Sequence, residues 1–215
     1  MTTDNLVLVF TNSWLFRRKN TMKDNKAEKK KSLLPLIAAS FTELGYRRAT
    51  TSELAARCKV KEAILYRLWP DKKAMFLDSL DFIAENLLTV WKEQLNTTAK
   101  NKIGLEVLLS YESEHFAELN NYHIIFSGLN EASDPDIKAS LQRMYFRIHS
   151  FLVEYITRYK VETGQAGGLD TTILAWALMS IGTMATITKH LGILTEQQRG
   201  QLLGDASKAL LTSKS

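Results

Sequence analysis

Apolar side chains along most of the chain recur at the spacing of an α-helix. In the segment from Ser32 to Leu44 they lie on one helical face, at intervals of four, four and three positions: Leu33, Ile37, Phe41 and Leu44. We predict that Ser32 is the N-cap of this helix, because Pro35 then falls in the first turn, where a helix tolerates proline. Gly45 is expected to end the helix.

Two short helices are predicted next, joined by a turn of three or four residues. A Thr-Thr-Ser run at 50–52 supplies N-capping side chains for a helix of about two turns that ends near Lys59. The second short helix is predicted from Lys61 to Trp69, since Pro70 prevents its continuation. Two short helices joined in this way form the helix-turn-helix pattern.

The rest of the chain predicts long helices. A periodic stretch from Lys72 to about Leu95 is followed by five further helices, expected at 103–119, 122–131, 136–162, 170–191 and 195–211. No strand-like alternation occurs after residue 20, and 3 Pro and 10 Gly are few for a fold rich in β-turns. The predicted fold class is therefore all-α.

The charge of the chain is unevenly distributed. Residues 1–80 carry 16 Lys and Arg against 8 Asp and Glu, whereas residues 81–215 carry 12 against 15. A basic first part and a mildly acidic second part indicate that the first part meets a polyanion, with a lysine-rich solubilising face as the alternative. The 45% hydrophobic and 24% charged residues exclude general disorder and a multi-pass membrane protein.

The N-terminus does not fit this helical plan. Residues 6–16 are apolar but too few to span a bilayer. Asp4 precedes them and a basic run at 17–19 follows, which reverses the order of a secretory signal. We interpret residues 1–25 as an N-terminal extension and hypothesise that the start is misassigned, with translation beginning at Met22.

No pattern typical of a catalytic, metal or cofactor site occurs. The single cysteine, Cys58, cannot form an internal disulfide, and no Cys/His grouping has zinc-site spacing. Ser/His/Asp groupings, a P-loop and a dinucleotide fingerprint are also missing from the sequence. We therefore expect a cytoplasmic protein that is not an enzyme and needs no metal or cofactor.

One segment resembles the N-terminal domain of the TetR family of transcriptional regulators. The resemblance extends from Leu33 to Leu80 and rests on order and spacing: FTELGY at 41–46, TTSELAA at 50–56, Val60, the Leu65-Tyr66 pair, Trp69 and Lys72. It implies a three-helix DNA-binding domain at 26–80 and a ligand-binding and dimerisation domain of about six helices at 81–215.

The turn and the second short helix depart from the family pattern. Lys59 stands where the family has the turn glycine, Lys61 replaces the serine cap, and Ala63 and Ile64 replace glycine and threonine. Lys59 is expected to need a positive φ, which costs a non-glycine residue about 1 kcal/mol. The base sequence that the family members recognise therefore does not transfer to this chain.

The resemblance implies that the second short helix enters the major groove of DNA. Lys61 and Arg67 are suited to donate hydrogen bonds to guanine or phosphate, and Glu62 to accept from cytosine N4. Ala63 and Ile64 are suited to contact thymine methyl groups. An alternative for Glu62 is repulsion of wrong sites or pairing with Lys61.

Other residues match family positions that hold phosphates. Thr50, Tyr66 and Lys72 form this group. Thr51, beside Thr50, is a further candidate DNA contact. The structural alternatives are an ordinary N-cap for Thr50 and a half-buried core aromatic for Tyr66. The lysine run at 29–31 resembles a flexible basic arm that adds phosphate contacts, with a solvated run as its alternative.

The second domain is expected to bind a small-molecule inducer and to form a homodimer through the last two helices. Candidate ligand contacts are Trp91, His123, Tyr145, His149 and Trp176. Structural core roles are the alternative for these residues. The predicted function is a ligand-responsive repressor that binds a palindromic operator in double-stranded DNA. A helical adaptor that keeps the fold without binding an operator is the alternative.

Overall fold

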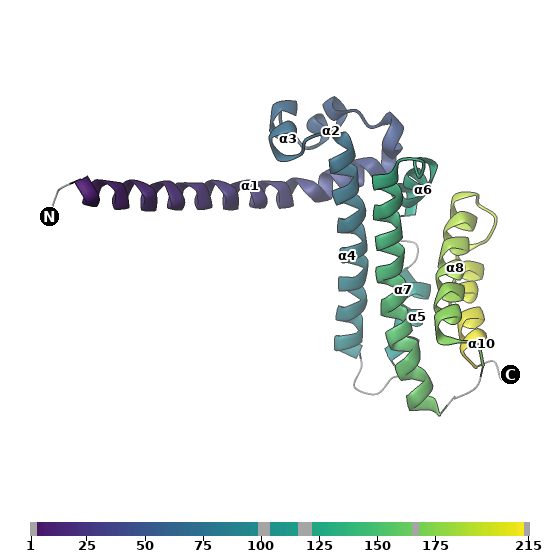
Figure 1. Cartoon of the computed structure of the whole chain (residues 1–215). Coiled ribbons are helices and arrows are strands. Elements are labelled where there is room, and N and C mark those ends of the chain that lie inside the picture. The colour runs from purple at the N-terminus through teal and green to yellow at the C-terminus, as the bar shows by residue number, and fades with distance from the viewer. Residues whose placement is uncertain (1–3, 99–103, 116–121, 165–167, 213–215) are drawn as a thin grey trace.

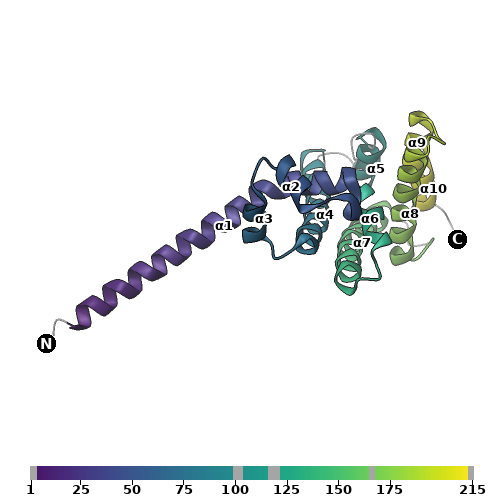
Figure 2. The same ribbon diagram turned by 90° about the horizontal axis from the view of Figure 1, so that it is seen from above.

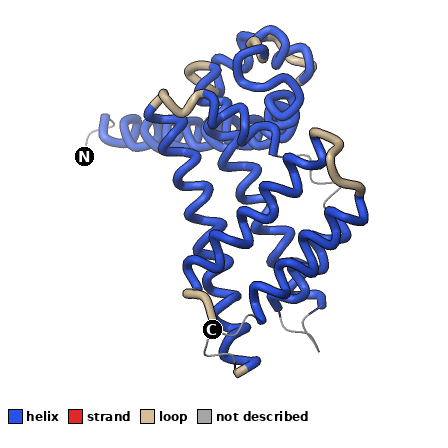
Figure 3. Tube along the Cα trace, turned by 90° about the vertical axis from the view of Figure 1, so that its right-hand side faces the viewer, coloured by secondary structure: helices blue, strands red, loops and turns tan. Residues whose placement is uncertain are grey.

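The computed structural model describes residues 4–98, 104–115, 122–164 and 168–212. Within these ranges the chain is helical and contains no strand (Figure 3), which confirms the predicted fold class. The elements in order are α1 Asp4–Arg48, α2 Thr51–Arg57, α3 Glu62–Leu68, α4 Lys72–Thr98, α5 Gly104–His115, α6 Tyr122–Asn130, α7 Pro135–Thr163, α8 Thr171–His190, α9 Glu196–Gln201, the π-helical turn η1 Leu202–Ala206 and α10 Ser207–Thr212.

The helices form a small head, made of α2, α3 and the adjoining end of α1, on a larger body made of α4 to α10. In Figure 1, α2 and α3 lie at one end of α4, while α4, α7 and α8 run lengthwise through the body. α1 packs against α4 and α6, and α5 packs against α4 and α7. The predicted helix at 195–211 is interrupted by η1, and residues 103 and 116–119 of another predicted helix lie outside the described residues. The predicted domain boundary after residue 80 falls inside α4.

The predicted start of the first helix at Ser32 is wrong. α1 continues through this position from Asp4, and the Ser32 hydroxyl donates to the carbonyl of Lys29 instead of capping the helix, at 2.9 Å. Pro35 lies inside the helix. A proline there removes one backbone hydrogen bond, but the buried Leu33 and Ile37 on either side keep the segment packed against the body.

The N-terminal half of α1 projects away from the rest of the molecule (Figures 1 and 2). Residues 4–25, expected to lie outside the fold, belong to this helix. The lysine run at 29–31 lies on it as well, so the prediction of a flexible arm is wrong. Residues 17–31 are polar and show no apolar face, so the spacing of apolar residues did not predict a helix there.

Gly45 ends the straight part of α1, as predicted. Its backbone has φ 73° and ψ 166°, a combination that is available almost only to glycine. The chain beyond it turns so that the Tyr46 N–H donates to the hydroxyl oxygen of Ser127 on α6, at 2.6 Å. Arg47 forms an ion pair with Glu131, the residue that follows α6, at 2.5 Å. The bend therefore attaches the head to α6.

A continuous hydrophobic core joins head and body. It extends from Leu33 on α1 to Leu211 on α10. At the junction, the Phe76 ring of α4 lies 5.1 Å from the Phe41 ring and 4.8 Å from the Tyr46 ring, measured between centroids. Aromatic pairs at such distances add to the stability gained by burial. α4 carries this core from one part of the molecule to the other.

Replacing Gly45 with alanine should destabilise the protein more than the same change at Gly164. A Cβ at Gly45 would meet the Ser127 hydroxyl at 3.3 Å, whereas a Cβ at Gly164, φ 67°, would meet nothing within 4 Å. We expect G45A to lower the free energy of unfolding by about 1–3 kcal/mol and G164A by about 1 kcal/mol. Urea denaturation measures both, and equal losses would contradict this account of the bend.

Candidate DNA interface and ligand cavity

α2, α3 and their connection have helix-turn-helix geometry. The Thr50 side chain accepts a hydrogen bond from the N–H of Glu53 at 3.1 Å, so its predicted N-cap role is confirmed. Lys59 has φ 53°, as expected for the residue in place of the turn glycine. The N–H of Lys59 donates to Ala56 and that of Val60 to Ala55, each at 3.0 Å. These bonds close α2 and direct the chain into α3.

The side chains of α3 divide into an inner and an outer face. Leu65 is fully buried, and Ile64 and Leu68 are half-buried against the core. Four residues of the outer face and its N-cap are exposed: Lys61, Ala63, Tyr66 and Arg67. Glu62 is half-buried, and the Lys61 side chain makes no cap hydrogen bond. The predicted DNA contacts Lys61, Ala63 and Arg67 therefore lie together on an open surface.

Two predicted DNA contacts are joined on this surface. The Tyr66 side chain is 51% exposed, so it is not a core aromatic. Its hydroxyl lies 3.0 Å from the hydroxyl of Thr51 and forms a hydrogen bond with it. Two hydroxyls from α2 and α3 are thus held side by side, in an arrangement that suits phosphate oxygens.

Lys72 is directed inward in this structure. Its ammonium donates to the carbonyl of Tyr46 at 2.9 Å and lies 4.4 Å from the centre of the Tyr46 ring. Burial lowers the pKa of Lys72. The residue therefore joins the start of α4 to the bend of α1, whereas the sequence assigned it to a phosphate.

Ion pairs hold the head together. Arg57 contacts Glu43 of α1 at 2.5 Å and Glu53 of its own helix at 2.8 Å, and its hydrogen bond to Glu43 lowers the pKa of that carboxyl. Asp78 accepts a hydrogen bond from the buried Trp69 indole and pairs with Lys30, both at 2.6 Å. The charged partners are partly exposed, so they fix orientation more than they add stability.

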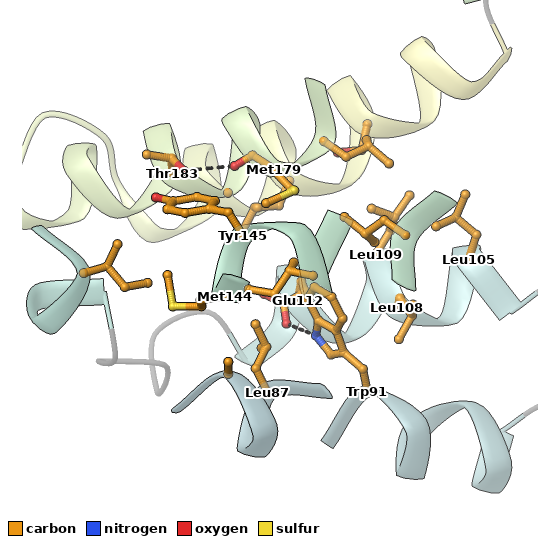
Figure 4. A pocket seen from close by; sticks show the side chains of 18 of the residues that line it. Leu87, Trp91, Leu105, Leu108, Leu109, Glu112, Met144, Tyr145, Met179 and Thr183 are labelled. Atoms are coloured by element: carbon orange, nitrogen blue, oxygen red, sulfur yellow. Dashed lines mark hydrogen bonds between the residues drawn. The ribbon is translucent and has the colours of Figure 1, made fainter. Parts of the chain in front are cut away.

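An apolar cavity of about 100 Å³ lies in the body, among α4, α5, α7 and α8. Of the predicted ligand contacts, Trp91 and Tyr145 line it (Figure 4). Most of the remaining wall is aliphatic or thioether, including Leu87, Leu105, Leu108, Met144 and Met179. Ligand sites in proteins are typically apolar hollows with a few polar groups.

The cavity contains a carboxylate that the sequence analysis missed. Glu112 lines it and accepts a hydrogen bond from the Trp91 indole at 2.6 Å (Figure 4). Burial raises the pKa of the nearby Tyr145 phenol. The signal was present in the sequence: Leu105, Leu108 and Leu109 form a helical stripe, and Glu112 is its next member.

Three predicted ligand residues do not line the cavity. His149 is buried, its Nε2 lies 3.0 Å from the Thr172 carbonyl, and its ring stacks on Trp176 at 4.5 Å. The His123 ring lies 3.9 Å from that of His190, and burial together with His123 lowers the pKa of His190. His149 therefore matches the structural alternative. The described residues contain no group of three or more His, Cys, Asp or Glu that would hold a metal ion.

Comparison with known proteins extends these observations. Residues 34–78 match the model of the family described as bacterial regulatory proteins, tetR family. The chain is 30% identical over 168 residues to the nucleoid occlusion factor SlmA of Klebsiella pneumoniae, an alignment that covers 75% of this chain and 81% of that protein. SlmA of Escherichia coli O1:K1 / APEC is 29% identical over the same length.

Solved structures have the same fold. A TetR-family regulator from Cytophaga hutchinsonii superposes with a TM-score of 0.74 at 12% identity, covering 89% of this chain and 96% of that one. The reduced form of Escherichia coli NemR gives a TM-score of 0.71 at 12% identity, with coverage of 85% and 97%. The helix-turn-helix geometry, the family match and the extended sequence identity agree: the chain belongs to the TetR family and is a DNA-binding regulator.

Proposed function

We propose that this protein is a cytoplasmic, ligand-responsive repressor that binds a palindromic DNA operator as a homodimer. The observation that carries the proposal is the outer face of α3, on which Lys61, Ala63 and Arg67 are exposed beside Tyr66. A forked guanidinium, an ammonium and a methyl group provide the chemistry that reads base edges in the major groove. The protein acts by binding and has no catalytic role.

The hydroxyls of Thr51 and Tyr66 set the head on the DNA backbone. They are 3.0 Å apart on the surface that carries the exposed side chains of α3. Phosphate contacts of this kind fix the register of a protein on DNA, while base contacts supply the specificity. Lys61 and Arg67 add the positive charge that attracts the duplex.

An exposed stripe on α8 supports dimerisation. Its apolar members are large and open to solvent, with exposed fractions of 56% for Ile173, 36% for Trp176, 50% for Met184 and 67% for Leu191. They are separated by three, eight and seven positions, which keeps them near one face of the helix. Isologous packing of this stripe on a second copy would bury it and pair two recognition helices.

Two helices connect the cavity to the head. α4 carries Trp91 on the cavity wall and, at its start, Lys72 bound to the Tyr46 carbonyl. α6 carries Ile125 on the wall and, two residues later, Ser127 bound to the Tyr46 N–H. A ligand that displaces either helix would move the bend of α1 and change the separation of the two recognition helices. This coupling must be reciprocal between ligand and DNA.

The relatives' role offers a second candidate function. The chain shares 30% identity with a nucleoid occlusion factor over 81% of that protein's length. This role is compatible with the DNA-binding head described above. The positions of the bound sites on the chromosome separate the two candidates: sites confined to promoters favour the repressor, and sites distributed over the chromosome favour the occlusion factor.

Purified protein should select a palindromic sequence from a random duplex pool. Because phosphate contacts dominate weak binding, the selection should be repeated at two salt concentrations. Enrichment of a palindrome at both is the expected outcome. Enrichment of no sequence at either would contradict operator binding and favour a helical adaptor that keeps the fold.

Arg67→Ala should weaken binding to the selected DNA by about 10- to 100-fold, since a base contact of arginine contributes on the order of 1–3 kcal/mol. Arg143→Ala is the matched control, because it removes the same charge from an exposed position on α7. Fluorescence anisotropy of labelled duplex measures both. Equal losses in the two variants would show that Arg67 acts only through net charge.

Met184→Lys should separate the dimer into monomers. An unpaired ammonium inside an apolar interface is expected to raise the dimer dissociation constant at least about 100-fold. Leu129→Lys places the same charge at another exposed apolar position, 47% exposed on α6, and should leave the dimer intact. Analytical ultracentrifugation gives both values, and a dimeric Met184→Lys protein would move the interface elsewhere.

A further inference from the structure

The described residues that line the cavity include one carboxylate. Among the described residues that line it, Glu112 is the single carboxylate and none is Lys, Arg or His. The carboxylate follows Leu105, Leu108 and Leu109 on the inner face of α5, so it stands at the end of an aliphatic wall. A charge in such apolar surroundings interacts with a ligand charge far more strongly than it would in water.

Aromatic and sulfur groups line the same cavity as the carboxylate. The Trp91 indole donates to Glu112 at 2.6 Å, which fixes the position of the carboxylate beside the ring. Tyr145 contributes a second ring to the wall, and Met144 and Met179 contribute thioethers (Figure 4). Aromatic faces attract cations, and thioethers are polarisable.

We propose that the cavity binds an organic cation, a molecule with an apolar body and a protonated amine or quaternary ammonium group. The cationic group lies against Glu112 and the Trp91 ring, and the apolar body against Leu87 and Leu105. The inference rests on the proposed ligand-responsive function and names the chemical class of its ligand.

The carboxylate also discriminates against other ligand classes. An anion of the same shape is repelled by Glu112 in a medium of low dielectric constant. A neutral molecule buries the same apolar area but gains no attraction to the carboxylate. The aliphatic wall accepts the apolar part of a cationic, an anionic and a neutral ligand equally. The difference in affinity among the three ligands therefore reports the contribution of the charge.

Isothermal titration of the full-length protein with three eight-carbon probes tests the proposal. Octylammonium, 1-octanol and octanoate share one chain and differ in charge. We expect octylammonium to bind at least about tenfold more tightly than 1-octanol, and octanoate to bind most weakly. Binding of 1-octanol or octanoate as tight as that of octylammonium overturns the proposal, and so does failure of all three to bind.

Glu112→Gln locates the effect. Glutamine keeps an oxygen that accepts the Trp91 hydrogen bond, so this variant should bind 1-octanol as before and lose the preference for octylammonium. Glu106→Gln removes a carboxylate from the same helix at a position outside the cavity lining and should keep the preference. A preference that is unchanged in Glu112→Gln, or lost equally in both variants, overturns the assignment.

DNA binding is measured separately, so the two failures remain distinct. A protein that selects DNA but prefers the neutral or anionic probe refutes the cation assignment alone. A protein that selects no DNA refutes the proposed function, whichever probe it prefers. If Glu112→Gln does not fold, the order of affinities of the native protein for the three probes still decides the proposal.

Discussion

The peptide group of Tyr46 is bound on both sides by the body of the protein, and the position of the DNA-binding head depends on it. Its N–H donates to Ser127 of α6, and the carbonyl of the same residue accepts from Lys72 of α4. Only the bend at Gly45 brings the chain into this position. α4 and α6 also line the cavity, so two helices of the cavity wall each form a hydrogen bond with Tyr46 of the head.

α4 packs against the head near its start and lines the cavity farther along its length. Phe76 near its start packs on Phe41 and Tyr46 of the head, while Trp91 four turns later forms part of the cavity wall. A straight helix transmits displacement because its backbone hydrogen bonds resist bending. α4 therefore connects the cavity wall at Trp91 directly to the head.

The order of the helices followed from the spacing of apolar residues. The positive φ at Lys59 followed from the family resemblance, in which a glycine occupies this turn position. The start of α1 was missed because Pro35 suggested a first turn, whereas burial of the flanking residues keeps the helix intact. Periodicity reports which face of a helix is buried and not which neighbour covers it. For this reason apolar spacing did not show that His149 lies in the core beside Trp176. Nor did it show that Glu112 lines the cavity.

Few residues attach α3 to the core, so the residues that stabilise the head differ from those exposed to DNA. Leu65 is the one residue of α3 that is fully buried, and Trp69, just past its end, supplies the second anchor. Substitutions at exposed positions such as Ala63 and Arg67 alter few internal contacts and generally change stability by less than about 0.5 kcal/mol. The exposed face of α3 can therefore change in sequence, and with it the contacts of the head with DNA, while the protein still folds.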